Sequence, residues 1–154
     1  MNKDILRFGD TEIEISRIDN IIFIQVFGCY TDEMALGLIQ RVGQLIDAIP
    51  ESSIRIWDGT GIPEEGYLLS SGCIDRVARW AEAIEAKKPG STAYMIIPSL
   101  VSFGMSRMYA LRADLEGSGV VVLRAVEELP QEIREKLSLS GIMARSTIRK
   151  GGSP

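Results

Sequence analysis

Two extended runs open the chain and predict a hairpin. Residues 12–16 (EIEIS) alternate polar and apolar side chains, which is the period of a half-buried strand. Residues 21–27 (IIFIQVF) are apolar and rich in β-branched side chains, which favours a central strand. Asp19-Asn20 lies between them as a turn pair, so we expect the two runs to pair antiparallel.

A helical period follows the hairpin. Thr31 is a candidate N-cap, and Asp32 and Glu33 place negative charge in the first turn, where the helix dipole favours it. The apolar positions then recur every three or four residues up to Pro50: Ala35, Leu38, Ile39, Val42, Leu45, Ile46 and Ile49. This pattern predicts one amphipathic helix that ends before the proline.

Strands and helices alternate through the rest of the chain. The predicted strands cover 54–57, 93–97 and 120–123, and the predicted helices cover about 73–84, about 99–115 and 126–137. Alternation of this kind predicts an α/β fold with a mostly parallel sheet of about five strands, an antiparallel N-terminal edge strand and helices packed on the sheet. We expect a single domain over 1–139 and a flexible tail over 140–154, where the periodicity is lost.

Composition excludes several classes of function. The chain of 154 residues contains no histidine, which removes histidine-dependent catalytic triads and histidine metal sites. Its net charge of -4 argues against a general nucleic-acid binder. No apolar run reaches the length of a membrane span, and no signal peptide is readable. We therefore expect a cytoplasmic protein that is not an enzyme and has no catalytic residues, no metal site and no cofactor.

The two cysteines form no metal or redox motif. Cys29 and Cys73 are 44 positions apart, so there is no C-x-x-C pair. Free cysteine is among the most frequently buried residue types, and we expect both to be small buried side chains.

The segment Asp58-Gly-Thr-Gly61 follows a predicted strand. Ligands of open α/β sheets bind at the carboxyl ends of strands, so Asp58 and Thr60 are candidates for binding a partner, and Thr60 for modification. The alternative is a simple turn, in which the glycines supply unusual backbone angles. The segment is not a phosphate-binding loop, because the pattern GxxxxGK[ST] is absent.

Ser70 and Ser71 precede the second predicted helix. Serine at this position caps free N–H groups of the helix, and the same position favours an added phosphate. Capping alone explains a serine there, so both interpretations stand. Glu64-Glu65 in the preceding connection have proline and glycine neighbours, which indicates an exposed loop rather than an acid/base pair.

The order of these pieces resembles the STAS superfamily, and within it the SpoIIAA-like (STAS/SEC14-type) bacterial proteins. The resemblance covers about residues 12–137 and rests on Gly28, Tyr30 and Thr31 before the first helix, on Asp58 at a strand end, and on VEEL after the last strand. In the anti-sigma-factor antagonists of the superfamily, a partner kinase phosphorylates a serine in a D-S-S-G turn before the second helix. Leu69-Ser70-Ser71-Gly72 keeps the Ser-Ser-Gly of that turn and lacks its aspartate.

The resemblance implies a small regulatory or binding protein. We expect it to engage a protein partner or a small ligand through residues 58–72. The alternative is a SEC14-like carrier of a lipid or other apolar ligand, with a pocket between the sheet and the helix 99–111. The apolar side chains of Val101, Phe103 and Met105 also suggest a homodimer.

Overall fold

The computed structural model of the chain describes residues 2–97 and 120–142. The elements, in order, are β1 (Asn2–Phe8), β2 (Thr11–Ile18), β3 (Ile21–Phe27), β4 (Tyr30–Thr31), α1 (Asp32–Asp47), β5 (Ile54–Gly61), η1 (Glu64–Gly66), β6 (Tyr67–Leu68), α2 (Ser71–Lys87), β7 (Thr92–Ile96), β8 (Val120–Leu123), η2 (Val126–Glu128) and α4 (Gln131–Leu139). The elements η1 and η2 are single turns of 3₁₀ helix.

One six-stranded sheet forms the centre of the molecule. Its strand order is β1-β2-β3-β5-β7-β8. The first three strands pair antiparallel and the remaining pairs are parallel. The expected α/β fold is therefore confirmed, with the hairpin 12–16/21–27 present as β2 and β3. A second, two-stranded ladder joins β4 to β6.

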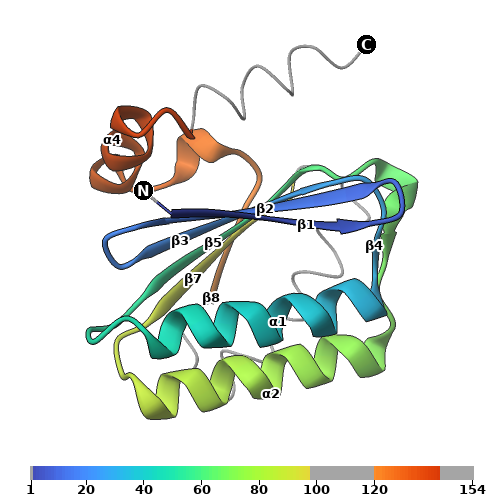
Figure 1. The fold of residues 1–154 in the computed structure, drawn as a ribbon, viewed down its shortest axis with the longest axis horizontal. Helices are drawn as coiled ribbons and strands as arrows, with labels where there is room; N and C mark the ends of the chain where they lie inside the picture. The colour runs from blue at the N-terminus through green and yellow to red at the C-terminus, as the bar shows by residue number, and fades with distance from the viewer. Residues whose placement is uncertain (1, 98–119, 143–154) are drawn as a thin grey trace.

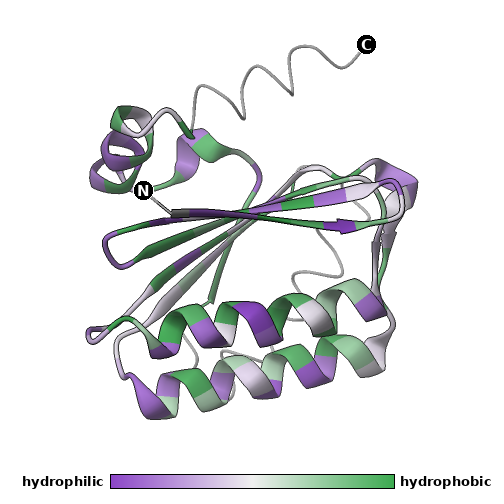
Figure 2. Cartoon of the chain, in the orientation of Figure 1, coloured by the Kyte–Doolittle hydropathy of each residue, from purple (hydrophilic) through white to green (hydrophobic). Residues whose placement is uncertain are grey.

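Helices cover both faces of the sheet. Figure 1 shows α1 and α2 lying along one face, with α4 on the opposite side. Hydrophobic and hydrophilic residues alternate along α1 and α2 in Figure 2, as they do in helices that pack one side on a sheet. The amino ends of both helices lie at the same end of the layer, next to β4.

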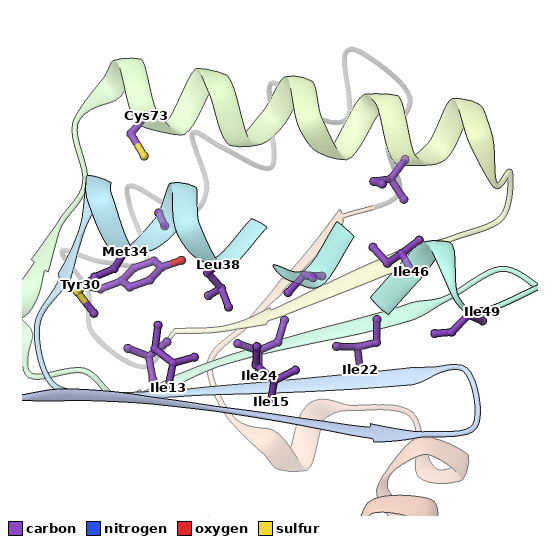
Figure 3. Packing of buried hydrophobic residues seen from close by; sticks show 14 residues of the cluster. Ile13, Ile15, Ile22, Ile24, Tyr30, Met34, Leu38, Ile46, Ile49 and Cys73 are labelled. Atoms are coloured by element: carbon purple, nitrogen blue, oxygen red, sulfur yellow. The ribbon is translucent and has the colours of Figure 1, made fainter. Parts of the chain in front are cut away.

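Three apolar clusters hold these layers together, and one of them joins Ile74, Ala78 and Ala81 of α2 to Ala93 and Val120 of the sheet. The cluster under α1 is buried between that helix and strands β2 and β3, whose side chains point toward one another in Figure 3. The cluster on the other face joins Ile21, Phe23, Ile56 and Ile96 to Leu129, Ile133 and Leu137 at α4. Ile21, Ile24, Ile56 and Ile96, which the sequence placed in the core, are at most 1% exposed.

The edge of the sheet differs from the expectation. The strand β2, expected at the edge, is covered by β1, which the sequence pattern did not reveal. The apolar residues of β1 are few and are split between its faces: Leu6 and Phe8 pack on the first cluster, whereas Ile5 is 43% exposed. Ion pairs provide further contacts between β1 and its neighbours. Lys3 pairs with Glu14 at 2.5 Å, and Asp4 pairs with Arg41 on α1.

Several sequence expectations fall outside the described residues. They are the helix at about 99–115, the homodimer face at Val101, Phe103 and Met105, and residues 143–154 of the expected tail. Ile142, which the sequence assigned to that tail, is 5% exposed and packs in the cluster under α4.

Truncation of the central strand tests the core assignment. We expect Ile24→Ala to lower the free energy of unfolding by about 2–5 kcal/mol, because it leaves a cavity between β3 and α1. Ile5→Ala on the exposed side of β1 is the matched control, and its loss should stay within about 0.5 kcal/mol. Urea unfolding measures both, and equal losses would contradict the assignment.

Candidate functional site

The short ladder between β4 and β6 brings the beginnings of two helices together. Tyr30 and Thr31 of β4 pair with Tyr67 and Leu68 of β6, and each strand leads into a helix, α1 or α2. The rings of Tyr30 and Tyr67 lie with centroids 6.0 Å apart. Residues 37 positions apart along the chain therefore meet at one end of the molecule.

A carboxylate of α1 binds the serine that begins α2. Asp32 Oδ1 accepts a hydrogen bond from the Ser70 backbone N–H at 2.8 Å, and Asp32 Oδ2 accepts one from the Ser70 hydroxyl at 2.5 Å. Ser70 Oγ in turn accepts a hydrogen bond from the Cys73 backbone N–H at 3.1 Å. We call this arrangement of Asp32, Ser70 and the Cys73 N–H the helix clasp. The expected cap of α2 is thus Ser70, whereas Thr31 occupies the N-cap of α1 without a side-chain cap bond.

The hydrogen bonds of the clasp hold Asp32 ionised. Bonds from the hydroxyl and then from the backbone N–H of Ser70 lower the pKa of the Asp32 carboxyl below its ordinary value. Ser71, the first residue of α2, is exposed and lies next to the free N–H groups of the first turn. The two serines thus differ: one hydroxyl is engaged on both sides and the other faces solvent.

The cysteines occupy different environments. Cys73 is 4% exposed at the start of α2 (Figure 3), and burial, followed by the charge of Asp32, raises the pKa of its thiol to about 11. Cys29 is exposed, so the expectation that both cysteines are buried is wrong for this one. Cys29 precedes the buried Tyr30 in the turn between β3 and β4, and its Sγ lies next to Gly66, where an added Cβ would be 3.2 Å away.

The segment 58–61 is a strand rather than the turn that the sequence suggested. It forms the last half of β5. Its glycines have no positive φ and are needed for close packing instead: a Cβ on Gly61 would lie 2.5 Å from the Val26 carbonyl oxygen, and one on Gly59 would lie 2.9 Å from Ile97 Cδ1. The expected role of glycine in supplying unusual backbone angles is therefore wrong here.

Asp58 belongs to a polar row inside the sheet. It is 2% exposed, and its Oδ1 accepts hydrogen bonds from the Thr60 N–H at 3.0 Å and the Thr60 hydroxyl at 2.7 Å. Its register neighbour on β3 is Gln25, whose neighbour on β2 is Glu14, and both are also 2% exposed.

The four candidate residues fall into two groups. Side chains alternate along a strand, so Asp58 shares the sheet face of Ile54 and Ile56, which pack toward α4. Ser70 and Ser71 belong to α2 on the other face. Asp32 joins them as a functional candidate that sequence reasoning treated only as a favourable charge in a first turn. No local signal links it to a serine 38 residues away.

An apolar cavity lies beneath the start of α2. Its volume is about 60 Å³, and the strands, α1, α2 and the connection from β5 to α2 all contribute to its walls. The walls include Ile24 and Trp57 on the sheet, Leu69 directly before the clasp, and Ile74 and Val77 on α2. Leu69, Trp57 and Val77 are half-buried, so the cavity is not fully enclosed, and Leu69 in its wall directly precedes the clasp residue Ser70.

A second pocket of about 320 Å³ lies between α4 and the sheet. Glu64 and Glu65 are exposed on η1, as expected. Among residues 2–97 and 120–142 no group of three potential metal ligands comes together. No helix within these ranges is long and apolar enough to cross a membrane.

The pKa of Asp32 offers a direct test of the clasp. A lowered native pKa means that ionised Asp32 adds stability above the pKa of the unfolded chain, near 3.8, and that this stability is lost as the pH falls. We expect Ser70→Ala to raise the pKa of Asp32, because both the hydroxyl donor and the helix cap are removed. Ser71→Ala should leave it unchanged. Carboxyl ¹³C titration by NMR measures the difference, and identical titrations of all three proteins would contradict the clasp.

Thiol labelling tests the two cysteine environments. At pH 8 iodoacetamide should modify Cys29 first, since that residue is exposed, whereas burial and a pKa of about 11 protect Cys73. Mass spectrometry of timed samples measures both rates. In Cys29→Ser, labelling should become slow. Rapid modification of native Cys73 would show that the start of α2 opens.

Comparison with known proteins identifies the fold. No protein-family model and no curated protein matches the sequence. Among solved structures, the anti-sigma factor antagonist SpoIIAA in its unphosphorylated form is similar, with a TM-score of 0.53 and 15% sequence identity. The match covers 82% of this chain and 97% of that one. The chain therefore has the same fold as SpoIIAA, as the resemblance noted in its sequence implied.

Proposed function

We propose that this protein is a non-enzymatic, cytoplasmic regulator that binds a protein partner at the end of the molecule where α1 and α2 begin. A phosphoryl group on Ser70 or Ser71 would control that binding. The SpoIIAA-like fold and the Ser-Ser-Gly at the start of α2 support the proposal. The observation that carries it is the helix clasp, in which a serine hydroxyl links two helices through a single carboxylate.

The clasp makes the surface sensitive to phosphorylation. When a kinase transfers the γ-phosphoryl group of ATP to a serine Oγ, the hydroxyl proton is lost and ADP leaves. On Ser70 this removes the proton that bonds Asp32 and places a phosphate against the carboxylate, where the two anions repel each other. Asp32 must then move away, and the surface formed by the two helix beginnings changes shape.

A phosphate on Ser71 would disturb the clasp less than a phosphate on Ser70. Ser71 is the first residue of α2, so the phosphate would meet the free N–H groups and the positive end of the helix dipole. The exposed Arg76 on the same helix would partly offset its charge. The fold would keep the clasp, while the added charge and bulk would alter what the surface binds.

The lipid-carrier alternative placed its pocket between the sheet and the helix expected at 99–111, which lies outside the described residues. Binding sites for small organic ligands usually measure about 300–1,000 Å³. The apolar cavity beneath α2 measures about 60 Å³ and a second pocket, between α4 and the sheet, measures about 320 Å³, so of these two only the second reaches that range.

Glutamate substitutions distinguish the two serines. We expect Ser71→Glu to leave the melting temperature close to that of the wild type, because an acidic side chain suits the first turn of α2. Ser70→Glu loses the cap and repels Asp32, which should cost about 1 kcal/mol, or roughly 2–4 °C.

Both variants should recover less of the partner than the wild type does, and Ser71→Ala should recover the same amount. The measurement is affinity capture from a lysate of the source organism, with each captured protein quantified by mass spectrometry beside a thermal melt. The proposal fails if all four proteins recover the same partners equally, or if Ser71→Glu unfolds the protein.

A further inference from the structure

We infer that the apolar cavity beneath the start of α2 receives one aliphatic side chain of the protein partner, and that basic residues flank this side chain on the partner's surface. The inference rests on the proposed function, because it names the chemistry of the partner at the same surface. Three observations carry it: the position of the cavity, its size, and the charge of its surroundings.

The cavity and the clasp share one surface. Leu69 forms part of the cavity wall and precedes Ser70 directly, and Ile74 lies one turn into the helix that Ser70 caps. Leu68, which precedes Leu69, is 55% exposed and adds apolar surface beside it. A partner that covers the clasp would therefore also cover the opening of the cavity.

The size of the cavity decides what can enter. About 60 Å³ exceeds the ≈ 30 Å³ that a water molecule occupies in the liquid and falls well below the ≈ 150 Å³ of an engineered cavity that binds benzene. The space suits the apolar end of one leucine, isoleucine or methionine side chain. Single apolar side chains that fill such pockets near the centre of an interface dominate binding energy in many complexes.

The charge of the surroundings decides the character of the partner. Asp32 and Glu33 begin α1, and Glu64 and Glu65 form η1 directly before β6. The pairing of β4 with β6 brings these two acidic pairs to the same end of the molecule. Arg76 is the exposed cation of the first two turns of α2. A basic surface complements this arrangement.

The same charge argues against a second copy as the occupant. A symmetric dimer through this surface would place each patch against its own copy. The carboxylates of Asp32, Glu33, Glu64 and Glu65 would then face each other and repel. A partner of different sequence avoids that cost.

Short peptides test the inference without knowledge of the partner. The probe is acetyl-Lys-Leu-Lys-amide, and its matched control is acetyl-Lys-Ala-Lys-amide. In ¹³C-methyl NMR spectra of the full chain, the leucine peptide should shift the signals of Ile24, Ile74 and Val77 in a saturable way. The alanine peptide should bind at least about fivefold more weakly, because the missing methyl groups leave the cavity unfilled. Added salt should weaken binding of the leucine peptide.

A variant that fills the cavity gives the second test. Val77→Phe places a larger side chain at the cavity wall and should lower the affinity for the leucine peptide at least about fivefold. Ala83→Phe, on an exposed position of α2, is the matched control and should bind like the wild type. A thermal melt of each variant establishes that it is folded, and the pair of peptides on the wild-type protein keeps the test independent of the variants.

Each alternative occupant has its own outcome. Equal affinity for the two peptides would overturn the inference. Saturable binding of decanoate that displaces the leucine peptide would assign the cavity to a lipid, and a concentration-dependent dimer that Val77→Phe dissociates would assign it to a second copy. If Ser71→Glu abolishes capture of the partner while Val77→Phe leaves it unchanged, the proposed function stands and the cavity inference fails. If the peptides bind as expected while neither serine variant affects capture, the cavity inference stands and the proposed phosphorylation control fails.

Discussion

The fold depends on the burial of β3 on both faces. Residues 21–26 are all buried, so a layer must cover each side of this strand. Ile22 and Ile24 require α1 and α2 beneath the sheet, and Ile21 and Phe23 require α4 above it. Because β3 and β5 run parallel, the helix that follows β3 and the helix that follows β5 begin at the same end of the sheet. The site exists because of that geometry.

The two helices are tied to each other at both ends by different chemistry. At their amino ends the carboxylate of Asp32 binds Ser70. At their carboxyl ends the Lys88 ammonium after α2 donates hydrogen bonds to carbonyl oxygens of Ile46, at 2.7 Å, and Ile49. Ile46 lies in the last turn of α1, where its carbonyl oxygen also accepts the Ile49 N–H at 3.0 Å, and Ile49 lies two residues beyond the helix. The contact at the amino ends depends on the Ser70 hydroxyl, whereas the contact at the carboxyl ends depends on an ammonium group.

Long periodic segments were predictable from the sequence and short or non-local features were not. The stripe from Ala35 to Ile49 and the apolar run of β3 each identified an element. A helix buried on one face shows periodic apolar positions, and a strand buried on both faces shows a continuous apolar run. The strand β1 has only a weak hydrophobic pattern, because ion pairs as well as apolar contacts attach it to its neighbours. The segment 58–61 resembles a turn by composition, yet its glycines serve a close approach to β3 and β7 that no local pattern encodes.

The location of the clasp outside the core suits it to regulation. Asp32 and Ser70 belong to none of the apolar clusters, and their hydrogen bonds lie at the surface. Charge-assisted bonds in such a position exchange readily with water or with a phosphate, so breaking them costs far less than opening a cluster. The neighbouring cavity walls, Ile74 and Leu69, belong to or pack against those clusters and stay in place. A modification at Ser70 or Ser71 can therefore change the charge and outline of the surface while the apolar cavity beside it keeps its shape.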